Sequence, residues 1–145
     1  MNILFVCTGN TCRSAMAAAL FNKIAIEKNL DVRIESAGIF ALDGEPASNE
    51  AVIAMKKYDI DLLGHHAQSI NTELIEKSDL ILTMTKAHKM VLEQSARGKV
   101  FTLCEYAGLD SDIDDPYGGD VVEYEECAEK LYNALIKVAE KLGNS

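Results

Sequence analysis

Long apolar runs are absent from this sequence. No stretch approaches the roughly 18 consecutive apolar residues of a membrane span, so we expect no membrane partner. The segment 1–6 has neither the basic start nor the long apolar core of a secretion signal. We therefore expect a cytoplasmic protein.

Positive charge is also scarce. The chain has 14 Lys and Arg residues against 23 Asp and Glu residues, for a net charge of −9. The negative electrostatic field of such a chain repels the phosphate backbones of nucleic acids, so we expect no nucleic-acid partner. Any anion site must then be built locally. The three histidines are scattered and form no close Cys/His pairs, so we predict no metal and no cofactor.

The four cysteines are Cys7, Cys12, Cys104 and Cys127. A chain without a secretion signal is expected in a reducing compartment, where thiols persist and a disulfide framework does not. The residues themselves assign no role to Cys104 and Cys127.

The pattern of apolar residues predicts one domain over residues 1–145. Buried strands are expected at 2–6, 31–36, 79–84 and 99–103. Helices are expected at 14–28, after a Ser48 cap, at 72–75, at 86–95 and from about 120 onward. Alternating strands and helices favour an α/β fold in three layers, with a four-stranded parallel sheet flanked by helices. The acidic stretch 104–120 is expected to be a long loop, which is often functional.

The stretch Cys7-Thr8-Gly9-Asn10-Thr11-Cys12-Arg13-Ser14 lies in the turn between the first strand and the first helix. A helix start offers unpaired N–H groups to an anion, and an open α/β sheet binds its ligands at such a turn. Gly9 is expected to take a positive φ, and the planar fork of Arg13 can hold two phosphate oxygens. Cys7 can act there as a thiolate nucleophile, or it can be a small buried residue at a strand end.

The spacing of Cys7, Arg13 and Ser14, together with Asp115-Pro116-Tyr117 about a hundred residues later, resembles the low-molecular-weight protein tyrosine phosphatase family. Ser36-Ala37-Gly38 and Gly64-His65 extend the resemblance over nearly the whole chain. Ala15 and Ala18 depart from it, since the family usually has proline and often glutamate there.

The resemblance implies that Cys7 attacks phosphorus and forms a phosphocysteine, that Arg13 holds the phosphoryl oxygens and that Asp115 is the general acid and base. It implies that Ser14 steadies the thiolate, that Asn10 holds the loop in shape and that Cys7 and Cys12 form a reversible disulfide. We expect His65 to support the loop, and His66 and His88 to be surface residues. The predicted substrate-binding residues are Thr8, Gly9, Asn10, Thr11, Cys12, Ser14, Phe40 and Tyr117.

Thr11 bears on the choice of substrate. Tyrosine-specific members of the family typically carry isoleucine there, and arginine-specific members carry threonine, whose hydroxyl suits a polar guanidinium. Gly118 after Tyr117 also resembles the arginine-specific branch. We therefore predict a protein arginine phosphatase with phosphorylated protein substrates.

Three alternatives remain open. A phosphotyrosine phosphatase is the nearest. An arsenate reductase would need relay cysteines, of which residues 80–103 have none. A phosphate-binding module without turnover would need neither the Cys7 thiolate nor the Asp115 proton donor.

Overall fold

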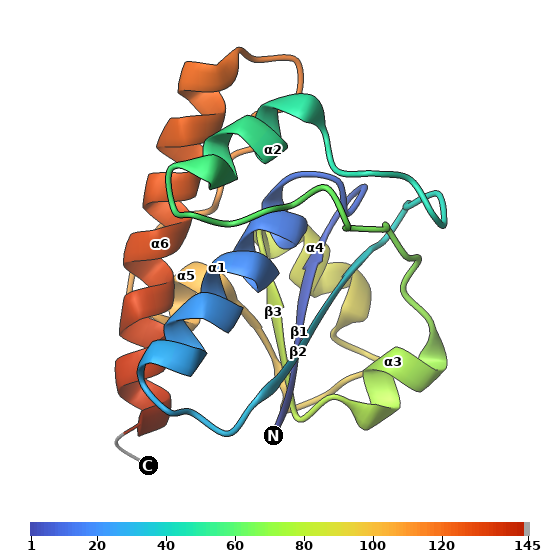
Figure 1. The fold of residues 1–145 in the computed structure, drawn as a ribbon. Helices are drawn as coiled ribbons and strands as arrows, with labels where there is room; N and C mark the ends of the chain where they lie inside the picture. The colour runs from blue at the N-terminus through green and yellow to red at the C-terminus, as the bar shows by residue number, and fades with distance from the viewer. Residues whose placement is uncertain (144–145) are drawn as a thin grey trace.

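The computed structural model describes residues 1–143 and contains a four-stranded sheet. Its strands are β1 (Asn2–Cys7), β2 (Arg33–Gly38), β3 (Leu80–Thr83) and β4 (Val100–Thr102). They lie in the order β2-β1-β3-β4 and every neighbouring pair is parallel (Figure 1). The predicted parallel sheet is therefore confirmed.

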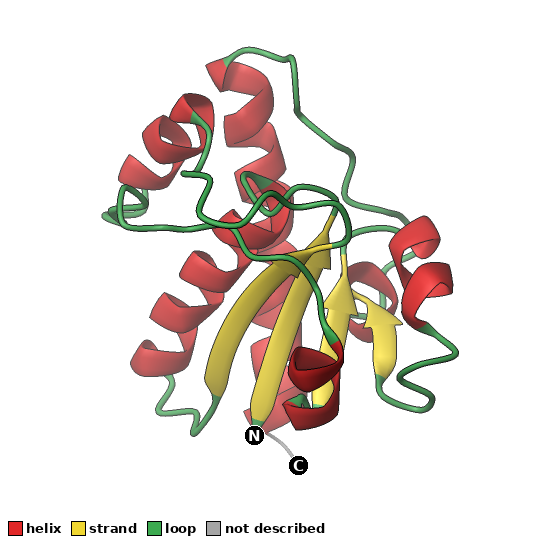
Figure 2. Ribbon diagram, turned by 90° about the vertical axis from the view of Figure 1, so that its right-hand side faces the viewer, coloured by secondary structure: helices red, strands yellow, loops and turns green. Residues whose placement is uncertain are grey.

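Helices cover both faces of this sheet (Figure 2). One face packs against α1 (Arg13–Glu27), α2 (Asn49–Lys56), α5 (Leu103–Tyr106) and α6 (Val121–Gly143). The other packs against α3 (Thr72–Lys77) and α4 (Lys86–Leu92). Side chains of β1 alternate between the two cores, with Ile3 and Phe5 in the first and Leu4 and Val6 in the second. The result is the expected three-layer α/β architecture.

The order of the strands shows at which edge of the sheet a ligand is expected. From β1 the chain moves outward to β2, and it then returns to place β3 on the opposite side of β1. In open α/β sheets, ligands bind at the carboxyl ends of strands where the direction of winding reverses. The loops after β1 and β3 are therefore neighbours at the edge where a ligand is expected.

Local sequence signals account for several helix ends. The Ser48 hydroxyl accepts a hydrogen bond from the Ala51 N–H at 3.3 Å, as expected of a cap. The Asp120 carboxylate accepts one from the Glu123 N–H at 3.0 Å, which places the start of α6 near the predicted residue. The predicted buried face of α6 is also observed: Tyr124, Ala128, Leu131, Leu135 and Val138 are all in the core.

Some predicted boundaries were wrong. β2 begins at Arg33 and ends at Gly38, two residues later than expected, because its register pairs Gly38 with Cys7. The expected loop from 104 starts inside α5, which Thr102 and Glu105 stabilise by a reciprocal capping box. α4 ends at Leu92 rather than near 95.

No helix among residues 1–143 is both long and apolar enough to cross a membrane. The assignment of residues 1–145 to one domain stays a prediction.

Candidate active site

The loop between β1 and α1 is tied to the segment that follows β2. The carbonyl oxygens of Cys7 and Thr8 accept hydrogen bonds from the N–H groups of Ile39 and Phe40, at 3.0 and 2.9 Å. Gly38 makes this approach possible, because a Cβ on it would lie 2.5 Å from the Thr8 carbonyl oxygen. The loop is thus positioned by backbone contacts with a second strand.

Asn10 shapes the loop from within. Its φ is 57°, whereas the φ of Gly9 is not positive, so the prediction for Gly9 was wrong. The buried Asn10 side chain donates to the hydroxyls of Ser14 and Ser36, at 2.8 and 2.9 Å. Its side-chain oxygen Oδ1 accepts from the Gln68 N–H at 3.0 Å. Asparagine tolerates the left-handed region, and three hydrogen bonds hold it there.

The Cys7 thiol lies at the floor of this loop. Its Sγ atom is 2.8 Å from the Ser14 hydroxyl, and the Asn10 N–H donates to it at 3.3 Å. The amino end of α1 follows at Arg13, where no side chain caps the helix. Polar hydrogens and a helix start therefore surround the sulfur, and both favour negative charge there.

Arg13 joins this loop to the acidic segment a hundred residues away. Its buried guanidinium donates to the Ile113 carbonyl oxygen at 2.9 Å and lies 3.6 Å from the carboxylate of Asp115. The buried Nε atom has no partner among the described residues. A buried donor left without an acceptor costs about 1–3 kcal/mol, so the site is built to receive an acceptor from a ligand.

Asp115 lies at the mouth of the site, with its side chain 48% exposed. One carboxylate oxygen accepts from the Tyr117 N–H at 3.0 Å and lies 3.8 Å from the Cys12 Sγ. Burial, and then the nearby Cys7, raise the pKa of Cys12 to about 12. Cys12 is therefore a neutral thiol that can donate weakly to Asp115.

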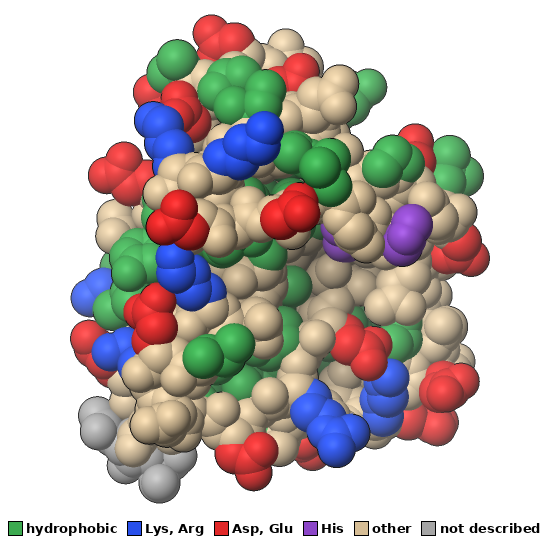
Figure 3. Space-filling view, viewed as in Figure 1, with side chains coloured by type: hydrophobic (Ala, Val, Ile, Leu, Met, Phe, Trp, Pro, Cys, Tyr) green, Lys and Arg blue, Asp and Glu red, His purple; other side chains and the backbone are tan. Residues whose placement is uncertain are grey.

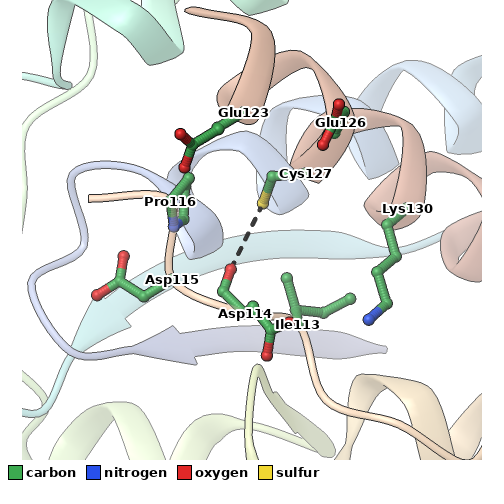
Figure 4. Close-up of a pocket in the computed structure, with 8 residues that line it drawn as sticks. All are labelled: Ile113, Asp114, Asp115, Pro116, Glu123, Glu126, Cys127 and Lys130. Atoms are coloured by element: carbon green, nitrogen blue, oxygen red, sulfur yellow. Dashed lines mark hydrogen bonds between the residues drawn. The ribbon is translucent and has the colours of Figure 1, made fainter. Parts of the chain in front are cut away.

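Behind Asp115 lies a cavity of about 240 Å³ between the acidic loop and α6. Figure 4 shows the Asp115 side chain pointing away from Cys127 and Lys130, which line this cavity. Burial raises the pKa of Cys127 to about 11, so its thiol is not ionised at neutral pH. The Asp115 carboxylate thus lies toward Arg13 and Cys12 rather than toward this cavity.

Two aromatic side chains stand at the rim of the site. The Phe40 N–H donates to the Thr8 carbonyl oxygen, and the Tyr117 N–H donates to the Asp115 carboxylate. They are 81% and 80% exposed, so neither is held in the core, and their contact with a substrate stays a prediction.

The sequence of residues 2–145 matches the family described as low molecular weight phosphotyrosine protein phosphatase. The chain belongs to this family. The resemblance seen in the sequence is therefore confirmed.

Relatives within the family carry two kinds of name. A protein-arginine-phosphatase of Bacillus subtilis is 42% identical, over 98% of this chain and 97% of the relative. A low molecular weight protein-tyrosine-phosphatase, PtpB of Staphylococcus epidermidis, is 38% identical over 95% and 96%. Among solved structures, a C7S mutant of the YwlE arginine phosphatase with a phosphorylated active-site serine has a TM-score of 0.94. It is 42% identical, with 98% of this chain and 95% of that one covered.

The family site gathers most of the predicted residues. Arg13 and Cys12 both contact Asp115, and Cys7 contacts Ser14 on the same loop as Cys12 and Arg13. His65 bonds the Asn10 carbonyl oxygen at 2.6 Å, as expected of a supporting residue, and His66 is exposed. Cys7 and Cys12 are both free thiols, so their disulfide stays a prediction.

One residue at the family site was missed. His88 was expected on the surface, but it is only 7% exposed and bonds the Thr8 hydroxyl at 2.9 Å. The only sequence signal was its position near the amino end of a helix that follows a strand. That signal cannot show which loop the side chain meets.

Proposed function

We propose that this protein is a protein arginine phosphatase that acts through a phosphocysteine intermediate. The observation that carries the proposal is the convergence of three groups: the Cys7 thiol beside Ser14, the buried Arg13 with an unpartnered Nε, and the half-exposed Asp115. The arginine-phosphatase relatives, similar over nearly their whole length, support it.

In the first step, the Cys7 thiolate attacks phosphorus and an S–P bond forms as the P–N bond to the guanidine breaks. Asp115 protonates the departing nitrogen, which leaves as neutral or protonated arginine. Arg13 and the loop N–H groups hold the three phosphoryl oxygens while their charge redistributes. The carboxylate that contacts Arg13 in the free protein is thereby drawn toward the leaving group.

In the second step, Asp115 removes a proton from water, and the resulting hydroxide attacks phosphorus. The S–P bond breaks, inorganic phosphate leaves and the Cys7 thiolate is restored. Ser14 lies 2.8 Å from the sulfur and can stabilise it each time it carries negative charge.

Thr11 is proposed to select the guanidinium. Its carbonyl oxygen accepts from the Ser48 N–H at 2.9 Å, so the backbone of this half-buried residue is anchored beside α2. A hydroxyl at the rim can accept a hydrogen bond from a guanidinium N–H, whereas the isoleucine of tyrosine-specific members can only pack against a ring. The exposed Phe40 and Tyr117 favour the second candidate, a tyrosine phosphatase, because they can stack on a phenyl ring.

Hydrolysis of matched phosphoarginine and phosphotyrosine peptides separates the two candidates. We expect a higher kcat/KM with phosphoarginine, and we expect Thr11→Ile to shift the ratio toward phosphotyrosine. A wild-type preference for phosphotyrosine would overturn the assignment. Cys7→Ser is the control, because it removes the nucleophile and should abolish turnover of both peptides.

Phosphorylated proteins are the substrates that the phosphatase relatives imply. A cytoplasmic location and the lack of a nucleic-acid partner stay predictions.

A further inference from the structure

His88 lies where the loops after β1 and β3 meet. Thr85 caps α4 by accepting a hydrogen bond from the His88 N–H at 3.2 Å, and His88 itself is in the first turn of that helix. The imidazole contacts a hydroxyl at each nitrogen. Nε2 is 2.9 Å from the Thr8 Oγ1, and Nδ1 is 3.0 Å from the Thr85 Oγ1. The ring thus links α4 to the residue that directly follows Cys7.

The hydrogen bonds around Thr85 assign the proton of the ring. The Thr85 hydroxyl already accepts the His88 N–H, and among residues 1–143 its own proton has only Nδ1 as an acceptor. We infer that Nδ1 is the unprotonated nitrogen, because it then accepts this hydroxyl proton, and the ring proton is on Nε2. Nε2–H therefore donates to the Thr8 hydroxyl.

The ring is neutral near pH 7, so Nε2–H keeps donating to the Thr8 hydroxyl and Nδ1 stays an acceptor. Burial first, and then the nearby Arg13, lower the pKa of His88 to about 4, against the opposing effects of Asp112 and Asp115. Because the charges of Arg13 and Asp115 both affect this pKa, the ring lies near the guanidinium and the carboxylate of the candidate active site. A doubly protonated ring would lose the acceptor that holds Thr85.

The Thr8 hydroxyl is left with a proton to give. His88 is its one hydrogen-bond partner in the part of the chain that the structure describes, and the hydroxyl accepts there when the ring proton is on Nε2. Thr8 is exposed and adjacent to Cys7, and its carbonyl oxygen is held by the Phe40 N–H. The Phe40 and His88 contacts therefore fix its position, and its proton is left for an acceptor outside residues 1–143.

We propose that His88 is a positioning residue that turns the Thr8 hydroxyl into a hydrogen-bond donor for an oxygen of the bound phosphoryl group. This inference rests on the proposed function. It makes Thr8 the donor in its contact with the phosphoryl group, and His88 the residue that orients the Thr8 hydroxyl. A hydrogen bond to a charged acceptor is stronger than one between neutral groups. The loss of this one should weaken phosphate binding about tenfold.

The test is a double-mutant cycle read by the affinity for inorganic phosphate, measured calorimetrically, and by KM and kcat for a phosphoarginine peptide. Thr8→Val removes the hydroxyl and keeps the shape, and His88→Leu removes the ring donor. His88→Gln places an amide N–H near the position of Nε2 and should restore binding. His66→Leu and His66→Gln are matched controls at an exposed histidine.

We expect Thr8→Val and His88→Leu each to weaken phosphate binding and raise KM about tenfold, with the double variant no weaker than either one. His88→Gln should remain within about threefold of the wild type. Losses that multiply in the double variant, or unchanged binding in Thr8→Val, would overturn the proposal. Lower thermal stability without a change in phosphate affinity would also overturn it, since His88 would then only support the fold.

Phosphate binding does not require turnover, so this test is separate from that of the proposed function. A wild type that binds phosphate but hydrolyses neither peptide would refute the phosphatase assignment and leave the cycle for His88 and Thr8 readable.

Discussion

Replacing Asn10 with alanine should collapse the loop that holds Cys7. The substitution removes two donated hydrogen bonds to Ser14 and Ser36 and one accepted from Gln68. It also places an alanine at φ 57°, where a Cβ without local hydrogen bonds is disfavoured.

The size of this effect follows from those contacts. The three hydrogen bonds of the Asn10 side chain contribute about 1 kcal/mol each, and the left-handed backbone adds about 1 kcal/mol for alanine. We expect the free energy of unfolding to fall by about 4 kcal/mol, measured by urea denaturation with a two-state fit. Asn10→Gly should lose about 3 kcal/mol, because glycine accepts the backbone angle but restores no hydrogen bond.

Asn29 supplies a matched control. It also has a positive φ, 55°, but its exposed side chain makes no hydrogen bond within residues 1–143. Asn29→Ala should therefore cost only about 1 kcal/mol. If Asn10→Ala and Asn29→Ala cost the same, the hydrogen bonds of Asn10 do not stabilise the loop and the reasoning is refuted.

Three further predictions concern catalysis, packing and pH. Asp115→Asn should lower kcat for phosphoarginine peptides by at least about a hundredfold while inorganic phosphate still binds; an unchanged kcat would exclude Asp115 as the proton donor. Gly38→Ala should lower stability by about 1–3 kcal/mol, since its Cβ would overlap the Thr8 carbonyl oxygen, whereas Gly64→Ala, in open space, should be nearly neutral in thermal unfolding. Stability should fall by about 3 kcal/mol between pH 6.5 and 4 through His88, because the unfolded chain takes up the proton first. His88→Gln should lack this component of the pH titration, and equal slopes for both proteins would refute it.

Local patterns accounted for much of the fold. Unbroken apolar runs predicted β1 and β3, and the 3.6-residue spacing from Tyr124 to Val138 predicted the buried face of α6. Elements whose ends depend on a partner were less predictable. β2 ends at Gly38 because Gly38 pairs with Cys7 of β1. The residues next to Gly38 or Cys7 in the sequence do not indicate this pairing.

In the candidate site too, local features were predictable and long-range contacts were not. Cys7, Arg13 and Ser14 lie within eight residues on one turn, so the sequence alone indicated their chemistry. His88 escaped detection because its contact with Thr8 spans 80 residues and depends on the crossover that places β3 beside β1. Gly9 was the expected residue with positive φ, but the hydrogen bonds of Asn10 with Ser36 and Gln68 place that angle one residue later.

By itself, the sequence determined the order of the elements, and it indicated the turn and the cysteine that we propose for phosphate binding and catalysis, since these depend on residues close together in the chain. Only the tertiary structure decided which distant groups complete the site: the contact of Asp115 with Arg13, the unpartnered Arg13 Nε and the link from His88 to Thr8. The physical reason is that strand order and packing determine contacts between residues far apart in the chain, and the spacing of neighbouring residues indicates neither.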